Sequence, residues 1–206
     1  MDVGERELIR WIRGAVGAPG RTTIVGIGDD AAVFEPPGEY ELITCDAFVD
    51  GVHFRHDFAS YREIGAKCMV ANVSDIAAMG GFPTRAVVTL AIPERISTQD
   101  IEDLYRGFLD VCRHFSFEIV GGDTISSQYE LSVSITLLGA VSRARVVTRA
   151  GAAVGDAILV TGRLGGSETG LQILSRGMPK HGLANDAIRR HPDLGERRPA
   201  LVEETA

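Results

Sequence analysis

Two adjacent carboxylates, Asp29 and Asp30, follow Gly26 and Gly28 and precede small residues. Neighbouring carboxylates repel each other, and a cation beside them offsets that repulsion. Glycines next to the carboxylates allow a polyphosphate to approach the backbone. The pattern therefore favours a site for divalent metal and phosphate, although glycine and aspartate are also the commonest residues of a plain polar turn.

Similar acidic positions recur along the chain. Asp46 follows the β-like run 40–44, where strand-end side chains converge on ligands or mark an ordinary strand-to-loop transition. Asn72 and Asp75 are three residues apart, so they share one face of a predicted helix and could point into one site. Asp123 follows two glycines at the end of another apolar run. These positions make a carboxylate-rich metal site the working hypothesis.

Other residue types offer weaker signals. His53 and His56 are too isolated from further Cys or His to predict a zinc site, and His53 is better interpreted as a contact to an anionic substrate or as a loop histidine bonded to backbone. Tyr105 lies on a predicted helix, where it either faces a ligand or is half-buried. A cluster of arginines is either solvated or a clamp for phosphate oxygens. Its members are Arg143, Arg145 and Arg149.

The elements that must position these residues can be predicted from periodicity and turn signals. Apolar residues at helical spacing predict helices over 5–16 and 100–115. Ser60 as a cap predicts a helix over 61–79, and we expect another over 168–175, after two glycines and a serine. β-like runs predict strands over 32–34 paired with 40–44, and over 86–92, 117–124, 131–141 and 155–162. This order predicts an α/β (α+β) fold with a mixed sheet and packed helices. We expect a domain over 1–150 and the beginning of an incomplete α/β domain over 151–206.

Composition limits the classes of function. The chain has 206 residues, a net charge of −7 and 45% apolar residues, which indicates a globular protein and argues against a general nucleic-acid binder. Its three cysteines form no C-x-x-C pair, which is typical of reduced cytosolic thiols. No apolar run reaches the length needed to cross a bilayer. We therefore expect a soluble, cytoplasmic protein without nucleic-acid or membrane partners.

Five motifs in register carry a resemblance to a known family. They are GIGDDAAV (26–33), TCDAFVDGVHF (44–54), KCMVANVSDIAAMGGFP (67–83), VGGDTISS (120–127) and the stretch from VVTRAGAAVGD to LGGSETGL (146–171). This set resembles the thiamine-monophosphate kinase family of the aminoimidazole-ribonucleotide-synthetase-like superfamily. The resemblance covers about residues 1–176.

The resemblance implies an N-terminal α/β domain that forms a homodimer through its sheet, with ATP near the dimer interface and Mg²⁺ ions bridging its phosphates. It also implies transfer of the γ-phosphoryl group of ATP directly to thiamine monophosphate, which gives thiamine diphosphate. No covalent nucleophile is expected. A set of carboxylates without such a nucleophile agrees with catalysis by positioning and charge neutralisation.

Roles carry over by matching positions. Asp29 is implied to support the ligands, and His53 to contact thiamine monophosphate. Cys45 stands where the family usually has threonine, and a thiol is a poor magnesium ligand. The implied magnesium ligands are Asp30, Thr44, Cys45, Asp46, Asp75 and Asp123. The implied ATP contacts are Tyr105, Gly122, Asp123 and Arg149.

The chain departs from the family pattern in two further ways. Ile125 and Ser126 stand where Thr-Arg often occurs, and the later D-x-S-D-G-L motif is absent from the 206 residues. The chain is therefore a fragment of a longer enzyme or a shortened protein. The alternatives are a non-catalytic nucleotide-binding or dimerisation module, or a hydrogenase-maturation or purine-synthesis relative; selenophosphate synthetase would need a reactive Cys before Cys45.

Overall fold

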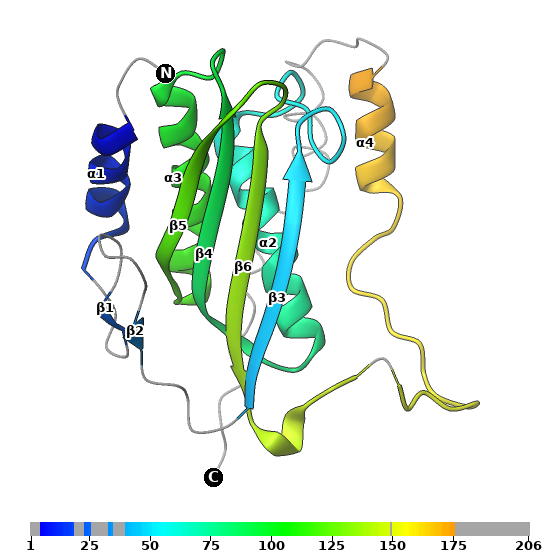
Figure 1. Cartoon of the computed structure of the whole chain (residues 1–206). Coiled ribbons are helices and arrows are strands. Elements are labelled where there is room, and N and C mark those ends of the chain that lie inside the picture. Colours follow the sequence, from blue (N-terminus) through cyan, green and yellow to red (C-terminus); the bar gives the residue numbers. More distant parts are fainter. Residues whose placement is uncertain (1–4, 19–22, 26–32, 35–39, 149, 176–206) are drawn as a thin grey trace. The chain divides into compact units, whose positions relative to one another are not determined.

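The computed structural model describes residues 5–18, 23–25, 33–34, 40–148 and 150–175 (Figure 1). It divides into two compact units, Met1–Val154 and Gly155–Ala206. In chain order the elements are α1 (Glu5–Val16), β1 (Thr23–Val25), β2 (Val33–Phe34), β3 (Tyr40–Val49), α2 (Tyr61–Ala78), β4 (Phe82–Pro93), α3 (Thr98–Phe115), β5 (Glu118–Ser127), β6 (Ser132–Val141), the 3-10 turn η1 (Arg143–Arg145) and α4 (Gly166–Ser175). None of the helices in these described ranges is long and apolar enough to cross a membrane.

The first unit is built on a four-stranded mixed sheet in the order β3-β6-β4-β5. Strand β6 pairs antiparallel with β3 and with β4, whereas β4 and β5 are parallel. Parallel neighbours require a long crossover connection, and α3 supplies it. The predicted mixed sheet with packed helices is therefore confirmed.

Helices α2 and α3 cover one face of this sheet, and no described helix of the first unit covers the other (Figure 1). The burial pattern of β6 reflects these two different faces, because its residues alternate between buried and half-buried along its whole length. Its Val133, Ile135 and Leu137 are fully buried beneath the helices. We call the uncovered side the open face, and it is formed by Ile43, Cys45, Ala47, Val87, Thr89, Ser134, Thr136 and Leu138.

The two covering helices start where their sequences predict. Ser60 caps α2, since its hydroxyl accepts from the Glu63 N–H while the Glu63 carboxylate accepts from the Ser60 N–H. Ser97 and Asp100 form the same reciprocal capping box before α3. Each box satisfies N–H groups that a helix start leaves without partners. The predicted cap at Ser60 is confirmed.

Two strand predictions are wrong. Strand β2 pairs with β1 rather than with residues 40–44. Strand β3 does not end at Thr44 but continues to Val49, paired with β6 at every residue. The partner strand supplies ladder hydrogen bonds beyond the polar Asp46, so the composition of the segment alone misplaces its end. Asp46 consequently lies within a strand rather than after one.

The second unit contains α4, which confirms the predicted helix over 168–175. The strand predicted over 155–162 is absent from the described part of this unit, and that prediction is wrong. Ile158 and Leu159 are 93% and 90% exposed there. A strand needs a neighbour to satisfy its backbone and cover its apolar side chains, and the described residues of this unit offer none.

Candidate functional site

The predicted site residues that the structure describes come from β3, the turn after it, α2, α3 and β5. Asp29, Asp30 and Arg149 lie outside the described residues. The remaining positions show which residues of the predicted carboxylate site a single copy of the chain brings together.

Thr44 and Asp75 are in direct contact. The Thr44 hydroxyl Oγ1 donates a hydrogen bond to Asp75 Oδ2 over 2.9 Å. Thr44 and Asp46 share the helix-covered side of β3, because side chains alternate along a strand and their partners on β6, Leu137 and Ile135, are buried beneath the helices. The structure thus brings the 44–46 motif of β3 and the 67–83 motif of α2 to one side of the sheet.

Asn72 and Asp75 do not share an exposed site, which corrects the prediction from their spacing. Asn72 is fully buried, and its Nδ2 donates to the Cys68 carbonyl over 3.1 Å. Its Oδ1 has no hydrogen-bond partner within the described part of the chain. Asp75 is exposed. A full helical turn takes about 3.6 residues, so side chains three residues apart point in different directions. Asn72 therefore points to the buried side of α2 and Asp75 to its exposed edge.

Cys45 points to the open face, away from Thr44 and Asp46. Its Sγ accepts from Thr136 Oγ1 over 3.4 Å and lies 3.7 Å from Ser134 Oγ. Consecutive strand residues cannot present their side chains to the same ligand. The Cys45 thiol therefore does not face a metal held by Thr44 and Asp46, and a contact from Cys45 to such a metal would have to come from its backbone. The implied role of Cys45 stays a prediction.

Asp123 lies on β5, at the other edge of the sheet from β3. Three strand spacings of roughly 4.8 Å separate the two edges by about 14 Å. Its register neighbours across the sheet are Thr89, Ser134 and Ala47, in a row on the open face. The residues that the structure describes accordingly contain no group of three His, Cys, Asp or Glu side chains arranged for a metal.

His53 is exposed in the turn after β3, and its ring has a defined orientation. The Val49 N–H donates to His53 Nδ1 over 3.0 Å. The neutral ring then carries its proton on Nε2, where it can donate to an anion. The Lys67 ammonium donates to the His53 carbonyl. This arrangement is chemically suited to the predicted contact with a phosphate.

Tyr105 belongs to the core. It is 3% exposed and packs edge-on against Trp11 and Phe108, with ring centroids 6.3 and 5.3 Å away. Burial raises the pKa of its hydroxyl far above the usual value. The available signal for this burial was helical spacing, because Tyr105 comes four residues after Ile101 and three before Phe108. An ATP contact by Tyr105 stays a prediction and would require the ring to move.

Gly122 has a structural reason to be glycine. A Cβ atom at this position would lie 2.0 Å from the Val88 carbonyl oxygen, so β5 and β4 approach more closely here than any side chain would permit. The predicted contact of Gly122 with ATP remains a prediction. The close approach shows that packing alone would also select this residue.

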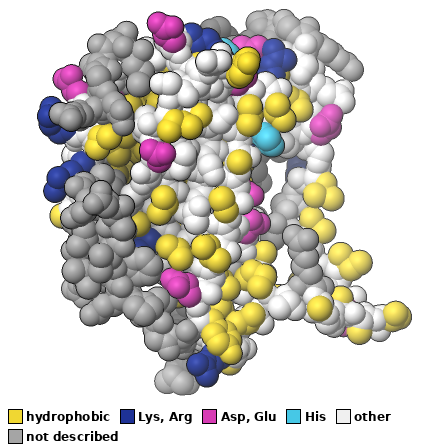
Figure 2. Space-filling model, viewed as in Figure 1, with side chains coloured by type: hydrophobic (Ala, Val, Ile, Leu, Met, Phe, Trp, Pro, Cys, Tyr) yellow, Lys and Arg dark blue, Asp and Glu magenta, His cyan; other side chains and the backbone are white. Residues whose placement is uncertain are grey.

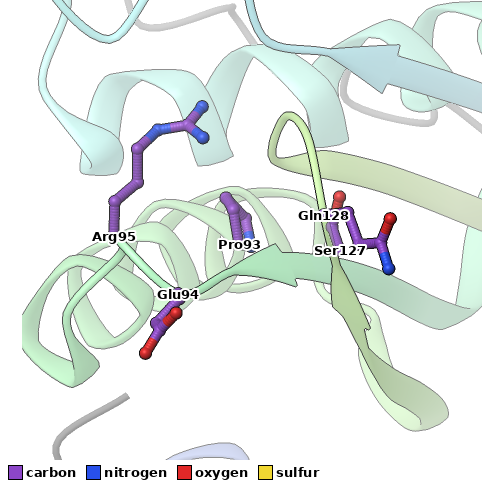
Figure 3. Close-up of a pocket in the computed structure, with 5 residues that line it drawn as sticks. All are labelled: Pro93, Glu94, Arg95, Ser127 and Gln128. Carbon is purple, nitrogen blue, oxygen red and sulfur yellow. The ribbon is translucent and has the colours of Figure 1, made fainter.

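An open cavity of about 590 Å³ is lined by none of these residues (Figure 3). It is lined by Pro93, Glu94, Arg95, Ser127 and Gln128. Glu94 and Arg95 point in different directions in Figure 3, and the Arg95 guanidinium is already paired with Glu130 and with the Tyr129 carbonyl. The cavity therefore presents no convergent set of polar groups for a ligand.

The sequence analysis missed one pairing. The Asp50 carboxylate lies 2.6 Å from His56 Nδ1 and is almost fully buried. The signal was a carboxylate and a histidine separated by a turn that contains Gly51, whose φ of +80° favours glycine. This pair lies directly beside His53.

The chain is similar to known proteins in sequence and in fold. Two similar curated relatives are thiamine-monophosphate kinases. The one from Rhodopirellula baltica is 44% identical, and the match covers 71% of this chain and 48% of the relative. The one from Bacillus subtilis is 37% identical, and the match covers 73% of this chain and 46% of the relative. The chain spans about half the length of the curated relatives it matches.

Two solved structures are similar to most of the chain. Thiamine-monophosphate kinase from Stenotrophomonas maltophilia superposes with a TM-score of 0.73 at 34% identity over 85% of this chain and 54% of its own. The structure of AaThiL complexed with AMPPCP and TMP superposes with a TM-score of 0.67 at 32% identity. The match covers 92% of this chain and 58% of the AaThiL chain. The family model described as AIR synthase related protein, N-terminal domain, matches residues 28–141, and the chain therefore belongs to the AIR synthase-related protein family.

Proposed function

We propose that the chain is the nucleotide-binding part of a kinase that uses ATP and Mg²⁺ to phosphorylate thiamine monophosphate directly to thiamine diphosphate. The contact between Thr44 and Asp75 carries the proposal, because it joins two of the five motifs on one side of the sheet. The similarity to AaThiL complexed with AMPPCP and TMP supports both substrates. The free thiols of the described chain suit a cytoplasmic location.

The described donor set fits magnesium in part. Thr44, Asp46 and Asp75 offer hydroxyl and carboxylate oxygens on the helix side of the sheet, and Mg²⁺ prefers oxygen ligands. The soft Cys45 thiol faces the other way. We propose that Asp30 and Asp123 complete the set. When bound, Mg²⁺ would neutralise charge on the phosphate oxygens of ATP.

The chain's own residues would act by holding and orienting the substrates. His53 would donate from Nε2 to the phosphate of thiamine monophosphate, and Lys67 fixes the backbone of that turn. Tyr105, Gly122, Asp123 and Arg149 stay the proposed ATP contacts. Such a site needs no covalent nucleophile, because in-line phosphoryl transfer depends mainly on alignment and charge stabilisation.

The open face is a surface that a second copy of the chain would cover. We propose a homodimer in which two open faces pack together. Ile43 is 71% exposed there, and Figure 2, drawn from the same side as Figure 1, shows hydrophobic side chains spread over the sheet among uncharged groups and a few acidic side chains. A two-fold axis parallel to the strands would place the β5 edge of one copy over the β3 edge of the other. The row that contains Asp123 would then face β3 of the second copy, whereas Asp46 would stay on the helix side of its own sheet.

Charge on the open face is expected to abolish the dimer. Leu138→Glu would bury an unpaired carboxylate in the interface, a change that costs several kcal/mol and raises the dimer dissociation constant roughly 100-fold or more. Sedimentation equilibrium measures the shift. Val70→Glu is the matched control, because Val70 is exposed on α2 and not on the open face. A Leu138→Glu chain that still sediments as a dimer contradicts this interface.

Thiol labelling offers an independent check. Burial raises the pKa of Cys68 and of Cys112 to about 12, so roughly one in 10⁴ of each is thiolate at pH 8, whereas Cys45 is exposed. We expect one fast-reacting thiol in the native chain and three in urea. Labelling of Cys45 should slow as the chain concentration rises through the dimer dissociation constant. A rate that does not change with concentration argues against burial of the open face.

Calorimetric titration tests the proposed function itself. The 206-residue chain is titrated with AMPPCP, with and without Mg²⁺, and then with thiamine monophosphate. Nucleotide binding that requires Mg²⁺ supports the proposal, and added binding of thiamine monophosphate extends it to the second substrate. Nucleotide binding that is equal with and without Mg²⁺ would favour the non-catalytic module. No binding of either compound overturns the proposal for this chain.

A further inference from the structure

The turn after β3 holds two histidine rings in opposite ways. Val49 donates its N–H to Nδ1 of His53, so that nitrogen is an acceptor. The Asp50 carboxylate lies 2.6 Å from Nδ1 of His56, and because an ionised carboxylate only accepts, that nitrogen is a donor. The partners therefore favour the Nε2–H tautomer at His53 and a protonated Nδ1 at His56.

Asp50 is the buried, hydrogen-bonded residue that anchors this turn. It is 4% exposed, and its own N–H donates to the Leu131 carbonyl over 3.0 Å. Its second carboxylate oxygen lies 3.4 Å from the backbone N–H of His56. A buried carboxylate is tolerated only when it is paired and hydrogen-bonded. His56 supplies both contacts, one from its ring Nδ1 and one from its backbone N–H. The Asp50 carboxylate therefore joins the end of the turn at His56 to its start at Asp50.

His53 lies between these two anchored ends. Gly51 donates its N–H to the Phe54 carbonyl over 2.8 Å, and His53 donates its N–H to the Val49 carbonyl over 2.9 Å. The turn is thus closed on both sides of the His53 ring. Arg55 does not compete for Asp50, because its guanidinium pairs with Asp57 and lies over the Phe58 ring.

We infer that Asp50 and His56 are positioning residues that close the turn and hold the His53 ring with Nε2–H presented to the phosphate of the acceptor substrate. The inference rests on the proposed function for the identity of that phosphate. The orientation of the ring itself follows from contacts within the turn. His56 acts through Asp50 and the backbone rather than by touching the substrate.

Two substitutions of His56 separate positioning from mere packing. Asparagine places an N–H donor close to the position of Nδ1 and keeps the bond to Asp50, whereas leucine fills similar space without a donor. His114→Leu is the matched control, because His114 is an exposed histidine of α3 remote from the turn in sequence. Each variant is made in the full 206-residue chain.

The first readout is the ¹⁵N spectrum of the His53 ring. We expect the Nε2–H tautomer to dominate in the unmodified chain, in His56→Asn and in His114→Leu, and the two tautomers to mix in His56→Leu. An unchanged His53 spectrum in His56→Leu overturns the inference. Equal mixing in His56→Asn and His56→Leu also overturns it. If His56→Leu does not fold, Asp50→Leu, which removes both acceptor oxygens, replaces it, with the same mixing expected.

The second readout is the dissociation constant for thiamine monophosphate in the presence of Mg²⁺ and AMPPCP. We expect it to rise about tenfold in His56→Leu and less than twofold in His56→Asn, with AMPPCP affinity unchanged in both. Equal affinities for thiamine monophosphate in all variants overturn the inference. If the unmodified chain does not bind thiamine monophosphate, the acceptor-substrate part of the proposed function fails for this chain, and the His53 spectrum still decides the positioning role.

Discussion

Replacing Gly107 with alanine is expected to lower the free energy of unfolding by about 3 kcal/mol. A Cβ atom at Gly107 of α3 would lie 2.0 Å from the Arg62 carbonyl oxygen and 2.7 Å from the Ala66 nitrogen of α2. The same contact is mirrored at Gly65, whose Cβ would lie 2.1 Å from the Leu104 carbonyl oxygen. The obstructing atoms are backbone, so a side-chain rotation cannot relieve the overlap and the two helices must separate.

A second glycine gives the control for this effect. Gly14 lies in α1 and a Cβ there would meet nothing within 4 Å. Gly14→Ala should therefore be neutral or stabilise by about 0.5–1 kcal/mol, as expected for glycine in an open helical position. Urea unfolding of both variants measures the difference. Equal midpoints for Gly107→Ala and Gly14→Ala would contradict the close helix crossing.

Local signals were sufficient to predict the helices. The Ser60 capping box of α2 and the apolar spacing of α3 depend only on residues a few positions apart. The strict alternation of β6 is equally local, because one face of that strand is buried and the other is not. The mixed sheet and its helices could be predicted because these signals agree with the tertiary structure.

Features that depend on distant partners were not predictable in the same way. Strand β3 continues to Val49 because β6, some 90 residues later, pairs with it. Residues 155–162 have strand-like composition and form no strand, because the described part of their unit offers no neighbour. Composition indicates how readily a segment forms a strand, but a strand forms only where a neighbouring strand is present to pair with it.

The candidate site shows the same limit. The family resemblance implied that Asp46 and Asp123 are ligands of the same site, but the strand order puts them at opposite edges of the sheet. The alternation of β3 could have separated Cys45 from its neighbours, because the period of two needs no structure. The contact of Thr44 with Asp75 could not have been predicted, since it depends on how α2 lies across the sheet.

Asp75→Asn is expected to weaken Mg²⁺-dependent nucleotide binding by roughly 100-fold, which corresponds to about 2.8 kcal/mol. The substitution keeps the volume of the side chain and removes its negative charge, so a hard cation loses a ligand. The fold should persist, because an amide oxygen can still accept the hydrogen bond that Thr44 Oγ1 donates. Calorimetric titration with AMPPCP, with and without Mg²⁺, measures the loss.

Asp103→Asn makes the same change of charge on the exposed side of α3, where Asp103 pairs with Arg106. Its nucleotide affinity should match that of the unmodified chain, which separates a specific ligand from the general acidity of the protein. Thermal unfolding of both variants should differ little, since an exposed ion pair contributes little to stability. If Asp75→Asn binds nucleotide as the unmodified chain does, the α2 carboxylate is no metal ligand, and its bond to Thr44 then serves only to hold β3 against the helix.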